Sequence, residues 1–418
     1  MLTEAEREAV EALDRTGLVA FLRELVAVPS VTGDEDAAQR RVAAWMRAEG
    51  LTVDAWEIDL ATLACHPDYS AEVERSAALG VVGVAGASGR GRDLLFDGHI
   101  DVVPVGDRAA WSVDPWAGVL RDGRVYGRGA CDMKGGLCAA LYAVKALRDA
   151  GVPLLGRVLV ASVAGEEEGG LGTLATLLRG HRADGAVVTE PTGLRLVTAA
   201  AGSLMFRLTV RGRAAHGSVR LEGISAVEKF LPLFAALRRL ETERNAAGGG
   251  DLFAAQRLPW PLEIGTVRAG EWASSVPERL VCEGRYGFAP GEDEGAAKQA
   301  FEVAVTEAAA ADAWLRAHPP LVEWWGGRFA PALTDPGDPL VTALAGAAAA
   351  VLGVPVRPEG VSYGSDMRLL VNVGRIPTAI FGPGDVRDSH RGDESVAVAD
   401  VEAAAATLIV TALRFCGC

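Results

Sequence analysis

The sequence predicts an α/β fold: a mixed, mostly parallel sheet with helices on both faces, and a smaller α+β domain inserted into it. Its 418 residues exceed what one ordinary hydrophobic core accommodates, so two domains are expected. Between residues 125 and 190, continuous apolar runs of strand length alternate with helical stretches, which is typical of a parallel sheet covered on both sides. From Gly202 onward, apolar and polar residues alternate along the strand-like runs, which indicates antiparallel strands.

The first part of the chain predicts helices followed by alternating strands and helices. Residues 5–50 favour two helices, because the loop VPSVTGDE interrupts an otherwise helical pattern with a proline and a glycine. Two β-type runs follow at 81–86 and 93–100, and ASGRGR (87–92) between them predicts a turn. The alternation continues with a helix over 134–150, a strand over 156–165, a helix over 171–180 and a strand over 185–191.

The inserted domain is expected over residues 203–330, so that the larger domain comprises residues 1–202 and 331–418. Its pattern is β-α-β-β-α, with strands over 203–212, 262–270 and 279–290 and helices near 224–243 and 294–312. The larger domain then resumes with a helix over 338–352, a strand over 377–382 and a final alanine-rich helix.

Charge and composition exclude several classes of partner. The net charge is −14 and there is no block of Lys and Arg, which argues against nucleic acid and anionic membrane surfaces. No apolar run reaches 18 residues, so no membrane span is expected, and the acidic N-terminal stretch MLTEAEREAVEAL does not resemble a signal peptide. We therefore expect a cytoplasmic protein. The six cysteines form no CxxC pair, and Cys416 and Cys418 are expected in a frayed tail.

Histidines and acids follow the predicted strands at the points where those strands end. Open α/β sheets place their sites beyond the carboxyl ends of strands, so these side chains are expected at one edge. They are His99, Glu166, Glu167, Glu190 and His390, with Asp132 just before a helix. Neutral imidazoles and carboxylates suit Zn²⁺, and a two-metal site with ions about 3.5–4 Å apart would activate a water and polarise a carbonyl. Asp101 is placed by strand alternation to accept the second N–H of the His99 imidazole.

Several segments in a fixed order along nearly the whole chain form recognisable motifs. They are GHIDVVP (98–104), WSVDPWAG (111–118), GRGACDMKGG (127–136), GEEEGGLGT (165–173), TEPT (189–192), RAAHGS (213–218), GRYGFAPGE (284–292), YGSDMRLL (363–370) and FGPGDVRDSH (381–390). In these motifs and their order the chain resembles the M20 metallopeptidases and deacylases, which include acetylornithine deacetylase, succinyl-diaminopimelate desuccinylase, aminoacylase and glutamate carboxypeptidase.

The resemblance implies a role for each candidate ligand. One metal would be held by His99, Asp132 and Glu190, and the other by Asp132, Glu167 and His390, so that Asp132 bridges the two. Glu166 resembles the general base. An alternative register would make Glu167 the base and Glu168 a ligand; otherwise Glu168 is expected to be a solvated side chain. Zinc is the expected metal, with cobalt as the alternative.

The inserted domain resembles the family's lid and dimerisation domain, which implies a homodimer. His216 resembles the histidine that stabilises the oxyanion in the partner subunit's site, and Arg285 the arginine that binds the substrate carboxylate. Asp366 is expected either to contact substrate or to hydrogen-bond near the site. Ser275 stands where relatives often carry asparagine.

These residues favour a metal-dependent amidohydrolase that removes an acyl group from an N-acyl amino acid or a related small amine by attack of a water held between the metals. The linkage cleaved would be a linear amide C–N bond. The first hypothesis for the specific activity is that of an acetylornithine deacetylase. The alternatives are a dipeptidase or carboxypeptidase, a deformylase of aminopyrimidines from the same family, and, from another class, a non-catalytic dimeric binding protein.

Overall fold

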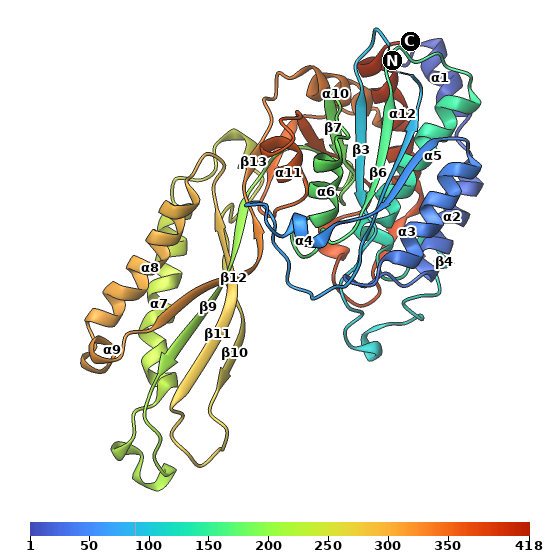
Figure 1. Ribbon diagram of the computed structural model, residues 1–418. Helices are drawn as coiled ribbons and strands as arrows, with labels where there is room; N and C mark the ends of the chain where they lie inside the picture. The colour runs from blue at the N-terminus through green and yellow to red at the C-terminus, as the bar shows by residue number, and fades with distance from the viewer. Residues whose placement is uncertain (88) are drawn as a thin grey trace. The chain divides into compact units, whose positions relative to one another are not determined.

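A computed structural model describes residues 1–87 and 89–418 of the chain; Ser88, inside the predicted turn at 87–92, lies outside the described residues. The chain forms two compact units (Figure 1). Unit 1 comprises Met1–Ala199, Ala332–Glu359 and Ser365–Cys418, and unit 2 comprises Ala200–Pro331 and Gly360–Gly364. The short segment Gly360–Gly364 therefore belongs to unit 2 although it lies far along the chain from the rest of that unit.

Among the described residues, nine strands form one sheet in the order β1-β2-β6-β3-β7-β15-β8-β13, with β14 paired to β8. Their bounds are β1 Thr52–Glu57, β2 Leu79–Ala85, β3 Leu94–His99, β6 Val158–Val163, β7 Gly185–Val188, β8 Leu196–Ala200, β13 Ala332–Leu333, β14 Pro358–Val361 and β15 Thr378–Ile380.

The centre of this sheet is parallel and its edges are antiparallel. Strand β3 runs parallel to both β6 and β7, and β15 runs parallel to β7. Strand β2 pairs antiparallel with β1 and β6, and β15 pairs antiparallel with β8. Four neighbouring strands, β6-β3-β7-β15, thus end at the same edge of the sheet, which positions the candidate site.

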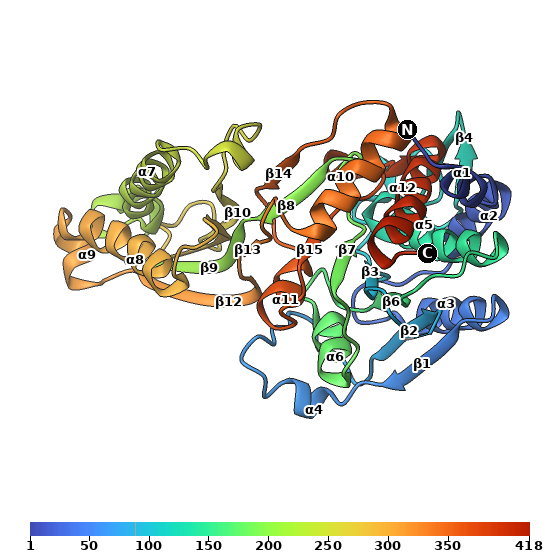
Figure 2. The same ribbon diagram turned by 90° about the horizontal axis from the view of Figure 1, so that it is seen from above.

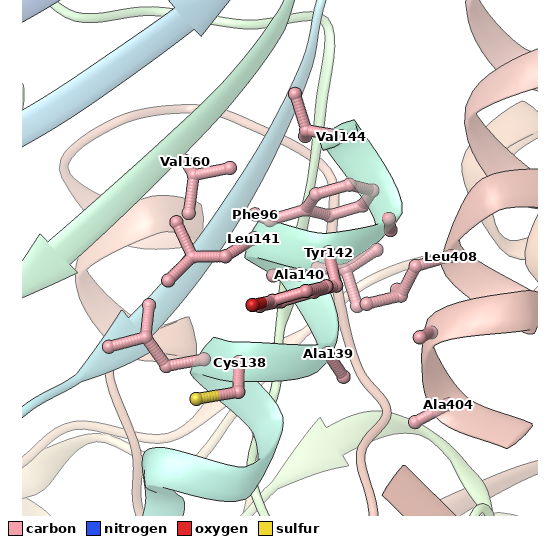
Figure 3. Close-up of a cluster of buried hydrophobic side chains, with 14 of the residues drawn as sticks. Phe96, Cys138, Ala139, Ala140, Leu141, Tyr142, Val144, Val160, Ala404 and Leu408 are labelled. Atoms are coloured by element: carbon pink, nitrogen blue, oxygen red, sulfur yellow. The ribbon is translucent and has the colours of Figure 1, made fainter. Parts of the chain in front are cut away.

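Helices cover both faces of the sheet, which confirms the predicted fold class (Figure 2). One face carries α5 (Gly135–Asp149), α10 (Pro339–Leu352) and α12 (Val398–Cys416), and the other carries α6 (Leu171–Arg179) and α11 (Met367–Asn372). Figure 3 shows Phe96 of β3, Leu141 of α5 and Leu408 of α12 among the side chains of the buried cluster. Because both faces are covered, β3 and β6 are buried along their whole lengths.

The N-terminal prediction of two helices is wrong, because the described residues form three: α1 (Glu4–Glu11), α2 (Arg15–Ala27) and α3 (Asp36–Ala48). Asp14 causes the extra break, since its side chain accepts a hydrogen bond from the N–H of Gly17 and so starts a new helix. The edge strand β1 was also missed; its half-buried residues lack the continuous apolar run of the central strands.

Unit 2 contains one strand more than predicted. Its described residues form a four-stranded antiparallel sheet in the order β10-β11-β9-β12. The bounds are β9 Gly202–Arg211, β10 Leu262–Ala269, β11 Arg279–Phe288 and β12 Leu321–Phe329, with helices α7 Ala226–Asn245 and α8 Glu294–Ala310. The missed strand, β12, carries Trp324, whose ring lies 5.3 Å from that of Phe301 in this unit's core.

The remaining described elements are short. They are the sheet β16-β5-β4 (Ser395–Ala397, Arg124–Tyr126, Val119–Arg121), helices α4 Leu60–Leu63 and α9 Ala313–Ala317, and the turns η1 Arg108–Ala110, η2 Ala130–Lys134, η3 Gly217–Glu222, η4 Asp251–Phe253 and η5 Val386–Asp388. The prediction of a frayed tail is wrong for Cys416, which is buried at the end of α12 and 1% exposed, whereas Cys418 is exposed. Among the described helices, none combines the length and apolar character needed to cross a membrane.

Candidate functional site

The four parallel strands bring the predicted ligands together at the carboxyl edge of the sheet. His99 is the last residue of β3; Glu166 and Glu167 follow β6; Glu190 follows β7; and His390 lies in the loop after β15. Asp132 comes from the turn that precedes α5, a helix that packs against the same strands. The structure therefore gathers residues separated by almost 300 positions, as the strand-end argument predicted.

Asp132 lies between the two histidines. Its Oδ1 is 3.1 Å from Nε2 of His99, and its Oδ2 is 3.3 Å from Nε2 of His390. Each carboxylate oxygen thus faces a different imidazole. This is the arrangement expected of a carboxylate that bridges two cations, each of which also has a histidine ligand.

Two further glutamates lie beside these histidines. Glu167 Oε1 is 3.0 Å from His390 Nε2, and Glu190 Oε1 is 3.9 Å from His99 Nε2. Donor atoms of His99, Glu166 and Glu190 all lie within 4.8 Å of one another, as do those of His99, Asp132 and Glu167.

These separations fit a metal centre. Two ligand atoms bound at about 2.1 Å to one tetrahedral zinc ion lie about 3.4 Å apart, close to the distances between these donors. The donor set of two imidazoles and several carboxylates is the chemistry that zinc and related divalent ions prefer. Of the acids, Glu166 and Glu190 are only 7% and 6% exposed, so their negative charges need cations close by.

The pKa shifts of the clustered residues also indicate that positive charge is required beside these carboxylates. Burial raises the pKa of Glu190 well above its usual range, and burial followed by the charge of Glu190 does the same to Glu166. Although burial opposes it, hydrogen bonds to Asp132 and Glu167 raise the pKa of His390 to about 10. These shifts favour protonated glutamates and a protonated His390 without metal, and divalent ions would displace those protons, leaving ionised carboxylates and neutral imidazoles.

The prediction for Asp101 needs correction. The atom that faces Nδ1 of His99, at 2.8 Å, is the backbone oxygen of Asp101; its side-chain Oδ1 is 3.6 Å away. The carboxylate instead accepts hydrogen bonds from the backbone N–H of Glu166 (3.1 Å) and Glu167 (3.2 Å) and from the hydroxyl of Thr32 (3.1 Å). Asp101 therefore orients His99 through its main chain and the two glutamates through its side chain.

Glu168 is not the solvated side chain that we expected. It is 2% exposed and forms an ion pair with Arg75, which also binds Glu35. Its second oxygen accepts hydrogen bonds from the backbone N–H of Glu72 and Val73. These contacts occupy the carboxylate and favour the register in which Glu166 is the base and Glu167 the ligand.

Asp366 is buried at the start of α11 and is 1% exposed, so of the two expected roles the structure favours hydrogen bonding over contact with substrate. Its Oδ2 accepts a hydrogen bond from the hydroxyl of Thr173 at 2.7 Å. Burial raises the pKa of Asp366 to about 6.

His216 and Arg285 belong to unit 2. His216 is exposed, and its Nδ1 lies 2.7 Å from the hydroxyl oxygen of Ser218. Residue 216 also pairs as an isolated antiparallel bridge with Ser275, which is exposed. Arg285 on β11 is half-buried; its Nη2 donates to the backbone oxygen of Ser362, and its Nε has no hydrogen-bond partner in the described part of the chain.

Two charged residues near the site, Glu394 and Arg128, were not predicted from the sequence. Glu394 is fully buried, Arg128 is 2% exposed, and the two form an ion pair. Both stand within or beside motifs already noted, since Arg128 lies in GRGACDMKGG and Glu394 is four residues after His390. Charged residues are almost never fully buried without a partner, but a sequence does not show which of its many charges are buried.

Comparison with known proteins identifies relatives along most of the chain. The family model of peptidase family M20/M25/M40 matches residues 95–414. The N-formyl-4-amino-5-aminomethyl-2-methylpyrimidine deformylase of Bacillus subtilis is 30% identical over 323 residues, which cover 73% of this chain and 75% of the relative. The succinyl-diaminopimelate desuccinylase of Methylibium petroleiphilum is 30% identical over 406 residues, covering 94% and 96% respectively.

Solved structures show the same fold. Human carnosine dipeptidase 1 has a TM-score of 0.77 at 16% identity and covers 99% of both chains. The M20 family metallo-carboxypeptidase Sso-CP2 of Sulfolobus solfataricus has a TM-score of 0.74 at 17% identity, covering 95% of this chain and 99% of its own. At these identities the likeness concerns the fold alone.

Proposed function

Because the chain belongs to peptidase family M20/M25/M40, a family of metal-dependent hydrolases that act on amide bonds, we propose that it removes an acyl group from a small N-acyl amine or N-acyl amino acid. The proposal places two divalent ions at the carboxyl edge of the unit 1 sheet, zinc first and cobalt second. The relatives named as a deformylase and a desuccinylase favour a deacylase over a peptidase. N-acetylornithine remains the first substrate to test.

The observation that carries this proposal is the position of Asp132 between two imidazoles, with one carboxylate oxygen facing each. A single metal site would not require both oxygens to face separate histidines. Under the proposal, His99 and Glu190 complete one metal position, and Glu167 and His390 complete the other.

Glu166 is the proposed proton carrier. Bound divalent ions would supply Lewis acidity, acidifying a water and polarising the substrate carbonyl. The carboxylate of Glu166 would take the proton of the attacking water and later deliver it to the departing amine nitrogen. Its burial favours this role, because a desolvated carboxylate holds a proton more strongly than an exposed one.

The family resemblance extends the proposal to unit 2. The guanidinium of Arg285, half-buried and without an acidic partner among the described residues, would bind a substrate carboxylate. His216 would stabilise the oxyanion, and unit 2 would mediate a homodimer. We also propose a cytoplasmic location: all six cysteines lie among the described residues and are free, which suits a reducing compartment.

A pair of variants tests the assignment of the two adjacent glutamates. Glu166→Gln keeps the shape of the side chain but cannot carry the proton, so we expect turnover to fall roughly 100- to 10,000-fold while both metals stay bound. Glu167→Gln should instead lower metal content, measured by elemental analysis of dialysed protein. Full activity in Glu166→Gln would mean that another group is the base.

The substrate class is tested with metal-loaded protein and a panel of amides at equal concentration. The arms are N-acetylornithine, N-succinyl-diaminopimelate, the N-formyl aminopyrimidine and a dipeptide. Preference for any of the first three supports deacylation. Preference for the dipeptide would replace the deacylase proposal by a dipeptidase, and cleavage of none by protein with both metals bound would favour the non-catalytic alternative.

A further inference from the structure

Glu394 connects two segments of the candidate site that are more than 250 residues apart in the sequence. Its Oε1 accepts hydrogen bonds from the backbone N–H of Cys131 (3.0 Å) and Asp132 (3.1 Å). Its backbone oxygen accepts another from the N–H of Gly127. Glu394 itself follows His390 by four residues. One buried side chain thus fixes the backbone that carries Asp132 to the loop that carries His390.

Arg128 holds the Glu394 carboxylate in place. Arg128 Nη1 donates to Oε2 of Glu394 at 2.5 Å, which leaves Oε1 for the two backbone N–H groups. Arg128 Nη2 donates to the backbone oxygens of Pro104 and Val105, and its guanidinium lies 5.2 Å from the ring centre of Trp111. The pair is therefore also fastened to the segment that follows His99, and with 2% and 0% of the two side chains exposed it excludes water.

Glu394 is one of several contacts that hold the His390 loop, since Asp393 accepts a hydrogen bond from the backbone N–H of Ser112 and Asp388 pairs with Arg124. The imidazole is the most exposed of the proposed ligands, with 51% of its side chain accessible, and its described partners are the two carboxylates of Asp132 and Glu167. Those carboxylates would themselves be bound to metal, so they cannot orient the ring independently. On the other side of Glu394, β16 pairs Ser395 with Tyr126 of β5, which fixes the chain downstream.

We infer that Glu394, held by Arg128, is a positioning residue that sets the distance between Asp132 and His390 and thereby the affinity of one of the two metal positions. The inference rests on the proposed metal centre. Asp132 would serve both positions, but His390 serves only one, so loss of the anchor affects the His390 position more than the one completed by His99 and Glu190.

The variant Glu394→Gln tests this inference, because its amide replaces an acceptor oxygen with a donor group facing Arg128. The matched control is Glu6→Gln. Glu6 is 5% exposed and forms a similar ion pair with Arg414, which joins α1 to α12 and touches none of the proposed ligands. Both variants remove one buried carboxylate paired with an arginine.

The measurement is the affinity of each of the two zinc ions, by competition with a chromophoric chelator, in wild type, Glu394→Gln, Glu6→Gln and His390→Ala. We expect Glu394→Gln to lower the affinity for one of the two zinc ions roughly 10- to 100-fold, the range found when partners that orient metal ligands are removed. The weakened position should be the one that His390→Ala abolishes, and the ratio of the two affinities should be unchanged in Glu6→Gln.

Thermal unfolding of the metal-free variants separates positioning from a general loss of structure. If both glutamine variants lower the melting temperature alike but only Glu394→Gln changes the affinity ratio, the positioning role holds. Glu394→Asp provides a second variant should Glu394→Gln fail to fold: it keeps the charge, but it is one methylene too short to reach Arg128 and both N–H groups, so the same selective loss is expected. The inference is overturned if Glu394→Gln lowers the affinity for both zinc ions equally or changes neither affinity. Wild-type protein that binds no metal would instead contradict the proposed function itself.

Discussion

Thr173 of α6 places one hydroxyl between two buried carboxyl groups. Its Oγ1 is 3.1 Å from Oδ2 of Asp97 and 2.7 Å from Oδ2 of Asp366, and each acid is 1% exposed. A hydroxyl carries a single hydrogen, so it donates to one carboxylate only, and the other acid must donate to it. The Oδ1 atoms of both acids have no hydrogen-bond partner among the described residues. Burial raises the pKa of both acids, which favours a proton on one of them.

This pair makes stability depend on pH in the direction opposite to that of a salt-bridged acid. Burial raises the pKa of Asp366 to about 6, above its value in an unfolded chain. Between about pH 4 and 6 the folded state binds the extra proton, so this contribution is complete below pH 4 and is lost as pH rises through about 6. The loss is on the order of 3 kcal/mol for a shift of about two pKa units.

Asp366→Asn is expected to remove the contribution of Asp366 to that pH dependence, because an amide does not ionise, whereas Asp97, whose pKa is also raised by burial, still does. The free energy of unfolding of metal-free protein, measured by urea denaturation at intervals from pH 4 to 7, should fall less steeply in the variant than in wild type. Asp122→Asn, at an exposed turn position with a positive φ, is the control and should keep the wild-type slope. An unchanged slope in Asp366→Asn would show that another group is responsible.

At the scale of elements, the turn Gly165–Gly170 between β6 and α6 is fixed from two sides. Asp101 binds the N–H groups of Glu166 and Glu167, as described above. The loop after α4 binds the turn's other end through the ion pair of Glu168 with Arg75, and Arg368 of α11 donates to the backbone oxygen of Gly169. Arg368 also donates to the backbone oxygen of Asp68, so the loop and the turn are joined twice.

Glu168→Gln is therefore expected to lower the free energy of unfolding substantially, although Glu168 has no proposed role in catalysis or metal binding. It leaves Arg75 without one of its two buried carboxylates, and breaking a buried pair from one side costs about 3–5 kcal/mol. Urea denaturation should detect this loss, and hydrogen exchange should be faster at the N–H groups of Glu72 and Val73, which lose their charged acceptor. Glu57→Gln, at the exposed end of β1, should stay within about 0.5 kcal/mol of wild type. A similarly small change in Glu168→Gln would restore the expectation of a solvated side chain.

At the scale of the whole molecule, the proposed ligands come from five separate segments of unit 1 and none comes from unit 2. Ions that bind only the folded state stabilise it by mass action, by about 2.7 kcal/mol for each site at a free-metal concentration one hundred times its dissociation constant. Bound metal is therefore expected to stabilise unit 1, which supplies the proposed ligands.

Removal of metal with a chelator is thus expected to lower the melting temperature of unit 1 by several degrees. Hydrogen exchange should become faster at the ends of β3, β6 and β7, while β9 and β11 of unit 2 keep their protection. Re-addition of zinc should restore the original profile. Equal loss of protection in both units would mean that the metals do not act through unit 1 alone.

Much of the fold followed from local patterns. The central strands β3 and β6 are fully buried because helices cover both faces of the sheet, and their apolar runs predicted their positions and a mostly parallel sheet. The edge strand β1 and the strand β12 lack this pattern, because each is only partly buried, and both were missed. The break before α2 depended on one capping side chain, which a helical periodicity does not reveal.

The candidate ligands could be recognised from the residues alone, since His99, Glu166, Glu167, Glu190 and His390 lie at or after the ends of strands that must meet in a parallel sheet. Which charges are buried, and what they pair with, depends on segments that are distant along the chain. Glu168 meets Arg75, Glu394 meets Arg128, and Asp366 meets Thr173 across gaps of 93, 266 and 193 residues. The position of a strand is indicated by its own residues, but the environment of a charge is created by the segments that fold around it.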